Sequence, residues 1–178
     1  MGTYPFIRIW VAGCSTGEEA YSIAILLKEA NLYHKSLIYA TDINPGVLER
    51  ASSGIFPISQ MQLYSENYRL SGGIEDFSKY YTANYDSVQF HHDLKEKMIF
   101  STHNLVSDSS FNAFQLILCR NVLIYFDKEL QNNVFDLFDI SLDALGYLAL
   151  GSKETIRFSK LEKQYKQIGD ERIWKKIR

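Results

Sequence analysis

Two glycines and two polar residues near the N-terminus have the types and spacing of a nucleotide-binding turn. An apolar run leads directly into Gly13, and Gly17 follows four positions later. Glycine permits tight backbone conformations that other residues avoid. Ser15 and Glu18 match a capping box, which predicts a helix over 18–28. A buried strand, a glycine turn and a helix N-terminus in this order are typical of the place where α/β folds hold nucleotides.

The residues around the two glycines restrict which ligand fits. A dinucleotide fingerprint requires Gly-x-Gly-x-x-Gly and a P-loop requires Gly-x-x-x-x-Gly-Lys-Ser/Thr, and neither pattern occurs here. Glu18 and Glu19 open the helix at the position where a phosphate would be repelled by them. A cationic ligand without phosphate fits better. S-adenosylmethionine has this character, because it carries a sulfonium, an ammonium, a single carboxylate and ribose hydroxyls that an acid can bind.

Composition and charge favour one globular domain and exclude several classes of protein. The chain has 178 residues, of which 46% are hydrophobic, so it can bury one sizeable core. A net charge of −2 is not typical of a nucleic-acid-binding protein. The sequence contains neither a signal pattern nor the run of about 18 apolar residues that a membrane helix needs. We therefore expect a cytoplasmic protein that contacts no nucleic acid and inserts into no membrane.

Cysteines and histidines predict no metal site. Cys14 and Cys119 each end a predicted strand, and we expect both to be free, buried thiols. The four histidines lack metal-ligand spacing with cysteines or acids.

The apolar runs and capping signals predict alternating strands and helices. Ser36–Asp42 and Phe114–Cys119 are typical of buried parallel strands. Asn44 should cap a helix over 45–53, and Asp127 a second helix that ends before Gly146. Later elements are a strand and a closing antiparallel pair, namely 146–151, 164–168 and 172–177. This order predicts a doubly wound α/β sheet with a C-terminal antiparallel hairpin.

The range from about 55 to 97 interrupts this alternation. It is rich in aromatic and turn residues and has no clean helical period, so we interpret it as an inserted small subdomain. A strand over 97–102 could belong to the insert or return to the main sheet.

Polar residues that follow the strand ends are the candidate site. Ligands of doubly wound sheets bind at the carboxyl ends of the strands. Asp42 could accept both hydroxyls of a ribose, or be an ordinary turn acid. A capping box alone would explain Glu18. Arg120 follows an apolar strand and needs a partner, which could be a ligand carboxylate or a nearby acid. The other candidates in this group are Gly13, His103, Asn104 and Asn121.

Five segments, in this order, resemble the catalytic domain of the chemotaxis receptor methyltransferases, the CheR family. They are Ala12–Ser22, Ala40–Ile43, Gly54–Phe56, His103–Leu105 and Leu118–Asp127. The resemblance implies a Rossmann-like class I methyltransferase fold over residues 1–178. It also implies transfer of a methyl group from S-adenosylmethionine to glutamate side chains on the cytoplasmic domain of bacterial chemoreceptors.

The resemblance assigns roles residue by residue. It places Tyr125 near the transferred methyl group, and we expect Tyr125 and Arg120 to act in catalysis. The residues expected to line the cofactor pocket are Gly13, Glu18, Asp42, Asn104, Leu105, Arg120 and Asn121.

Three departures from the family pattern keep other functions open. We expect the family's N-terminal helical domain, and the cofactor contacts made by the segment that follows it, to be missing from these 178 residues. Ala20 replaces a family proline, and Gly151–Thr155 lacks a family histidine, so the sequence assigns that loop no role. The alternatives are a non-catalytic module that binds S-adenosylmethionine or S-adenosylhomocysteine or docks a receptor, and a methyltransferase of the same fold with another acceptor.

Overall fold

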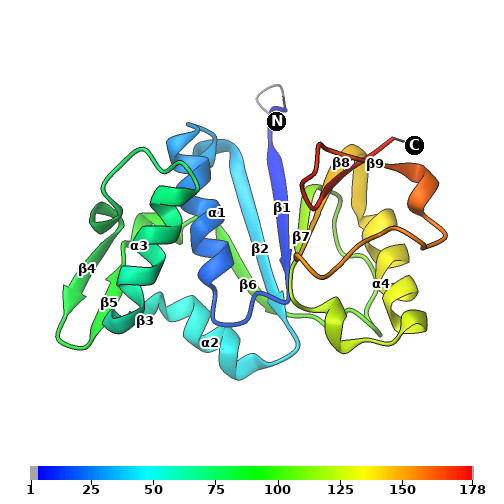
Figure 1. Ribbon diagram of the computed structural model, residues 1–178. Helices are drawn as coiled ribbons and strands as arrows, with labels where there is room; N and C mark the ends of the chain where they lie inside the picture. Colours follow the sequence, from blue (N-terminus) through cyan, green and yellow to red (C-terminus); the bar gives the residue numbers. More distant parts are fainter. Residues whose placement is uncertain (1–3, 178) are drawn as a thin grey trace.

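A seven-stranded sheet forms the centre of the molecule, and the computed structural model describes residues 4–177. The strand order is β6-β2-β1-β7-β8-β10-β9 (Figure 1). Strands β6 to β8 in this order run parallel, whereas β10 pairs antiparallel with β8 and β9. The strands are β1 (Ile7–Ala12), β2 (Ser36–Asp42), β6 (Met98–Thr102), β7 (Phe114–Cys119), β8 (Leu142–Leu150), β9 (Tyr165–Gln167) and β10 (Ile173–Lys176).

The order of the strands creates a switch point between β1 and β7. The chain runs from β1 outward through β2 to β6, and then returns to the other side of β1 with β7 and β8. A doubly wound sheet binds its ligands at such a reversal. The predicted doubly wound sheet and C-terminal hairpin are confirmed. Strand β6 pairs with β2, so this segment belongs to the main sheet and not to the insert.

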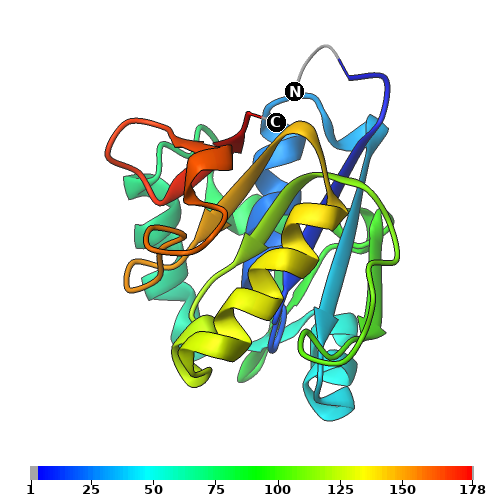
Figure 2. The ribbon, with the colours of Figure 1, turned by 90° about the vertical axis from the view of Figure 1, so that its right-hand side faces the viewer.

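Helices cover both faces of the sheet. Successive side chains of β1 point to opposite faces, and they are buried on both. Ile9 and Val11 belong to a core cluster shared with α1 and α2, whereas Trp10 belongs to a cluster shared with α4. Figure 2 shows α4 in front of the sheet and α1 behind it. No helix within residues 4–177 is long and apolar enough to cross a bilayer. The helices are α1 (Glu18–Glu29), α2 (Pro45–Ser53) and α4 (Lys128–Ser141).

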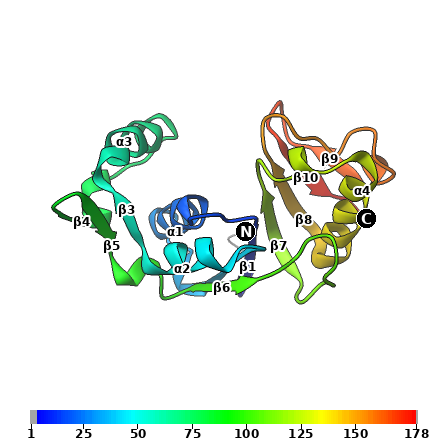
Figure 3. The ribbon, with the colours of Figure 1, turned by 90° about the horizontal axis from the view of Figure 1, so that it is seen from below.

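A second, antiparallel sheet lies within the range where the sequence predicts an insertion. Its order is β3-β5-β4, and it stands at one end of the molecule together with α3 (Figures 1 and 3). The Tyr21 ring of α1 packs against Phe56 and Phe90 of this sheet, with ring centroids 5.5 and 5.2 Å away. These contacts join the second sheet to the main domain through aromatic packing. Its elements are β3 (Ile55–Pro57), α3 (Met61–Leu70), β4 (Tyr81–Asn84) and β5 (Ser87–Phe90).

Two of the three predicted helix caps are present. The Asn44 and Asp127 side chains accept hydrogen bonds from backbone N–H groups in the first turns of α2 and α4, at 2.9 Å each. The capping box of Ser15 with Glu18 is wrong. Gly17 is the N-cap of α1, with φ of 98° and no side-chain hydrogen bond. Ser15 has a left-handed φ of 49° and lies too early in the turn to cap the helix.

Candidate functional site

The predicted site residues follow the carboxyl ends of four neighbouring strands, β1, β2, β6 and β7. Backbone hydrogen bonds tie these ends together. The Thr41 carbonyl accepts from the N–H groups of Gly13 and Cys14 at 2.8 and 2.9 Å, and the Asp42 carbonyl accepts from His103 at 3.1 Å. The topology thus places residues distant in sequence along a single edge of the sheet.

The glycine turn after β1 packs directly on the turn after β7. Gly13 and Gly17 have φ of 76° and 98°, in the region that favours glycine. A β-carbon on Gly13 would lie 2.4 Å from Cγ2 of Val122, much closer than atoms can approach. Only glycine therefore allows the two turns to meet at the switch point.

Asp42 orients the glycine turn with both carboxylate oxygens. Oδ2 accepts from the Ser15 N–H at 2.9 Å, and Oδ1 accepts from the Asn44 N–H at 3.0 Å. Asp42 is half-buried at the end of β2. Each carboxylate oxygen can accept a second hydrogen bond, so the group retains capacity for a pair of hydroxyls.

Three carboxylates make the glycine turn electronegative. The pKa of the Cys14 thiol is raised to about 12, mainly by burial and then by the negative charges of Asp42, Glu18 and Glu19. The Glu18 carboxylate accepts from the Thr16 hydroxyl at 2.7 Å. Such a turn repels phosphate and attracts a cation, so the donor set present fits a sulfonium or ammonium ligand.

Arg120 finds its partner on α1. Its Nη1 donates to Oε1 of Glu19 at 2.8 Å, which links the turn after β7 to the helix that opens after β1. Burial raises the pKa of Glu19, and the Arg120 guanidinium opposes that shift. About half of the Arg120 side chain remains exposed. The sequence left two partners open for Arg120, a ligand carboxylate or a nearby acid. In the structure its partner is the acid Glu19.

Glu154 is a buried residue of this site that sequence reasoning missed. It is only 4% exposed and follows β8. Its Oε2 accepts from the N–H groups of Asn121 and Gly151 at 3.0 and 2.6 Å, and its Oε1 accepts from Val122 and Leu123 at 2.8 Å each. Asn121 has a left-handed φ of 60°. One carboxylate therefore fixes the irregular turn that carries Arg120 and Asn121.

The loop after β6 carries the remaining cofactor candidates. The Asn104 side-chain oxygen accepts from the Val106 N–H at 2.9 Å, and the Asn104 backbone N–H donates to Asp108 at 2.8 Å. Leu105 is 8% exposed. The buried Nδ1 of His103 has no hydrogen-bond partner among the described residues. This loop is ordered by its own hydrogen bonds and stands beside the end of β2.

Tyr125 is a strongly exposed member of the predicted site. It lies in a short helical turn, Leu123–Tyr125, and 80% of it is exposed. Within residues 4–177 its hydroxyl has no hydrogen-bond partner. The structure leaves its ring free to meet a second molecule, and its catalytic role stays a prediction.

The parallel strands and the reversal of strand order between β1 and β7 give the domain a Rossmann-like fold. A family model described as "CheR methyltransferase, SAM binding domain" matches residues 2–173. The chain belongs to the CheR methyltransferase family, and S-adenosylmethionine is its cofactor.

Curated relatives agree with this assignment. A protein named Cher3 from Pseudomonas putida is 49% identical over 98% of this chain and 64% of its own length. Proteins named chemotaxis protein methyltransferase from Borreliella burgdorferi and Salmonella typhimurium are 39% and 34% identical, over 86% and 89% of this chain. The chain spans 54% of the length of each of these two relatives.

Proposed function

We propose that this chain is the catalytic domain of a protein-glutamate O-methyltransferase that acts in the cytoplasm on bacterial chemoreceptors. The observation that carries the proposal is the family match over residues 2–173, together with an electronegative glycine turn that suits the cofactor. Relatives named chemotaxis protein methyltransferase support chemoreceptors as the acceptor.

The proposed cofactor pocket follows the edge of the sheet between β6 and β7. In it, Asp42 would accept the ribose hydroxyls, and the glycine turn would bring backbone close to the ligand. Glu18 would favour the positive charges of the cofactor. Arg120 could bind the carboxylate of the cofactor if its guanidinium gave up the ion pair with Glu19. The residues proposed to line the pocket are Gly13, Glu18, Asp42, Asn104, Leu105, Arg120 and Asn121.

The chemistry requires alignment and exclusion of water more than acid–base catalysis. The cofactor supplies a methyl group activated by its sulfonium. A glutamate side chain, with a reference pKa of about 4.3, is already ionised at neutral pH, so the protein need not remove a proton from it. An anion and a cation lose charge as they react, and a dry, rigid site therefore favours the reaction. We assign Tyr125 to orienting the acceptor carboxylate.

Transfer of radiolabelled methyl groups tests the proposal. The chain is incubated with labelled S-adenosylmethionine and the cytoplasmic domain of a chemoreceptor encoded in the same genome. We expect label on the receptor that alkali releases as methanol, because the product is an ester. Binding of the cofactor with no transfer, or label that resists alkali, would contradict a glutamate methyltransferase.

Tyr125→Phe tests the role of the hydroxyl within the same assay. Because the Tyr125 hydroxyl makes no hydrogen bond to the proposed cofactor residues within residues 4–177, the variant should bind S-adenosylhomocysteine as the unchanged chain does. We expect kcat to fall at least about 10-fold, because the acceptor carboxylate would lose its alignment with the methyl group. An unchanged kcat would remove Tyr125 from the mechanism.

A further inference from the structure

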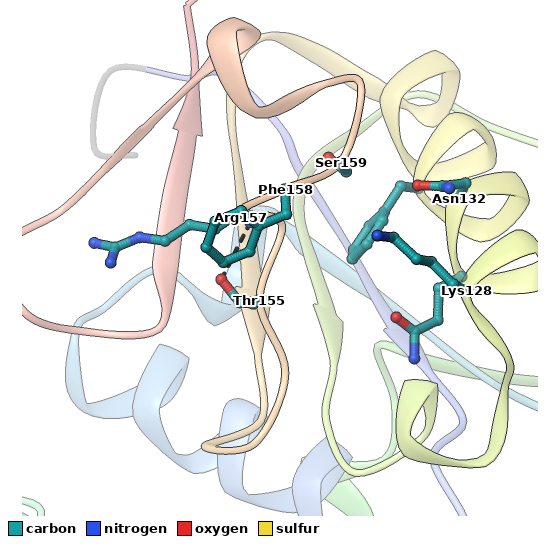
Figure 4. Close-up of a pocket in the computed structure, with 8 residues that line it drawn as sticks. Lys128, Asn132, Thr155, Arg157, Phe158 and Ser159 are labelled. Atoms are coloured by element: carbon teal, nitrogen blue, oxygen red, sulfur yellow. Dashed lines mark hydrogen bonds between the residues drawn. The ribbon is translucent and has the colours of Figure 1, made fainter.

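We propose that a hollow beside Tyr125 binds an acidic segment of the acceptor protein next to the methylated glutamate. This inference rests on the function proposed above. The hollow, of about 290 Å³, lies between the first half of α4 and the loop after β8. Figure 4 shows Lys128 and Asn132 of α4 facing Thr155, Phe158 and Ser159 of that loop.

The positive side chains that line the hollow favour an acidic occupant. Among the described residues, no acid lines the hollow. Lys128 is exposed, and its ammonium pairs with no carboxylate within residues 4–177. Arg157 lies at the other end of the hollow and extends away from α4, where its guanidinium donates to Gln167 at 2.6 Å (Figure 4). Two cations therefore flank Phe158, and they attract carboxylates while they repel the sulfonium and ammonium of the cofactor.

The acids nearest in the chain are Asp127 and Glu129, which flank Lys128, and Glu162, which follows Phe158; none of them lines the hollow. Asp136 pairs with Lys160 at 2.5 Å. Glu162 accepts from the Phe158 N–H at 2.9 Å.

Phe158 supplies an apolar anchor within the hollow. Its φ of 66° is one that non-glycine residues adopt rarely, and 83% of the residue is exposed. The hydrogen bond from its N–H to Glu162 holds the backbone in this conformation. An exposed aromatic ring on a backbone held by a hydrogen bond can insert into a pocket of a binding partner.

The position of the hollow connects it to the proposed chemistry. Nε2 of Gln131, which lines the hollow, donates to the carbonyl groups of Leu123 and Phe126 at 2.9 and 3.0 Å. These two carbonyls lie on either side of Tyr125 in sequence. On the opposite wall, Thr155 directly follows Glu154, which fixes the same turn. A segment held in the hollow would thus place a neighbouring glutamate near Tyr125.

A charge-reversed variant tests the proposal. We compare Lys128→Glu/Arg157→Glu with the control Lys163→Glu/Lys166→Glu, which reverses two exposed lysines outside the hollow. The acceptor is the chemoreceptor domain of the transfer assay. Because two exposed charge pairs would become repulsive, we expect the KM for this domain to rise about 10-fold. The kcat and the affinity for S-adenosylhomocysteine should stay within about twofold, and the control should resemble the unchanged chain.

Phe158→Asn tests the anchor without risk to the fold, because asparagine tolerates a left-handed φ better than phenylalanine. We expect the KM for the receptor domain to rise about 5-fold, which is typical when one aromatic ring is removed from an exposed binding surface. Stability to urea should be unchanged or higher.

The outcomes separate this proposal from the proposed function. Methyl transfer with equal KM in the unchanged chain and both hollow variants would overturn the docking surface alone. Absence of base-labile transfer by the unchanged chain would overturn the proposed function, and the inference with it. A concentration-dependent dimer that Phe158→Asn abolishes would assign the hollow to a second copy of the chain, and would also overturn the proposal.

Discussion

Individual carboxylates in this site have two roles. They fix the positions of neighbouring groups, and they give the site its negative charge. Asp42 accepts from the N–H groups of Ser15 and Asn44, and thereby orients the glycine turn. Glu19 is held by Arg120. The two acids differ in how readily they can bind a ligand. Glu19 is engaged in an ion pair, whereas Asp42 can accept further hydrogen bonds. Asp42 is therefore the residue where cofactor affinity should depend most on one side chain.

Asp42→Ala should weaken binding of S-adenosylhomocysteine more than it destabilises the fold. Loss of the hydrogen bonds to two hydroxyls should cost about 2–3 kcal/mol, or roughly 30- to 150-fold in Kd. Loss of its bonds to the turn should lower the free energy of unfolding by about 1–2 kcal/mol. Calorimetric titration and urea unfolding measure the two effects.

Asp86→Ala is the matched control, because Asp86 is an exposed acid in the insert. This variant should leave both quantities unchanged. Equal affinity per folded molecule in Asp42→Ala and the unchanged chain would contradict the ribose assignment.

At the scale of elements, the site depends on how the ends of β7 and β8 are joined. Glu154 accepts from four backbone N–H groups, one from its own loop and three from the turn after β7. That turn contains Asn121 with a left-handed φ and carries the Arg120 that reaches α1. A buried carboxylate with this many donors stabilises the ends of both strands as one unit.

Glu154→Gln should destabilise the chain by about 3 kcal/mol, because an amide NH₂ would face two N–H donors in a buried position. We also expect weaker binding of S-adenosylhomocysteine, since the turn with Arg120 and Asn121 would shift. Urea unfolding and calorimetry measure these changes. Glu162→Gln is the control, as this exposed acid accepts one backbone N–H and should cost less than about 1 kcal/mol. Equal stability of Glu154→Gln and Glu162→Gln would contradict the role of Glu154.

Elements with strong local signals could be predicted from the sequence, and those that depend on tertiary contacts could not. Strands β1, β2 and β7 are apolar runs, and Asn44 and Asp127 are caps whose partners lie two and three residues away. Helix α3 was not predicted, because only Met61 of its residues is buried, and Tyr64 and Tyr68, which pack on the core beside it, belong to a residue type that is a weak helix former.

Two features of the site could not be predicted from the sequence, because they too depend on tertiary contacts. The capping box failed because the turn at Ser15 is shaped by Asp42, a residue distant in sequence. Glu154 binds donors more than 30 positions away, and nothing local distinguishes it from an exposed acid.

At the scale of the whole molecule, the sheet places two free thiols inside the core near the acidic edge. Cys14 and Cys119 are both buried and free. Burial raises the pKa of Cys119 well above its ordinary value, and nearby carboxylates add to the shift. The pKa of Cys14 is raised to about 12. Both thiols therefore stay protonated in the folded state at any pH near neutrality.

The raised pKa values predict loss of stability in alkali. Above pH 9 the unfolded chain releases its thiol protons while the folded chain keeps them, so the free energy of unfolding falls as pH rises. Each thiol should contribute a loss of about 1.4 kcal/mol per pH unit from about pH 9 towards the folded-state pKa. Urea unfolding from about pH 7 to 11 measures this slope. A free energy that stays constant over the upper half of that range would contradict buried, protonated thiols.

The most direct test of the account is calorimetric titration of this chain with S-adenosylhomocysteine, with NADH as the control ligand. The electronegative glycine turn and the free acceptor capacity of Asp42 predict saturable one-to-one binding of S-adenosylhomocysteine. They predict no binding of NADH, whose phosphates the turn would repel. Binding of NADH, or a folded chain that binds neither ligand, would contradict the site described for these 178 residues.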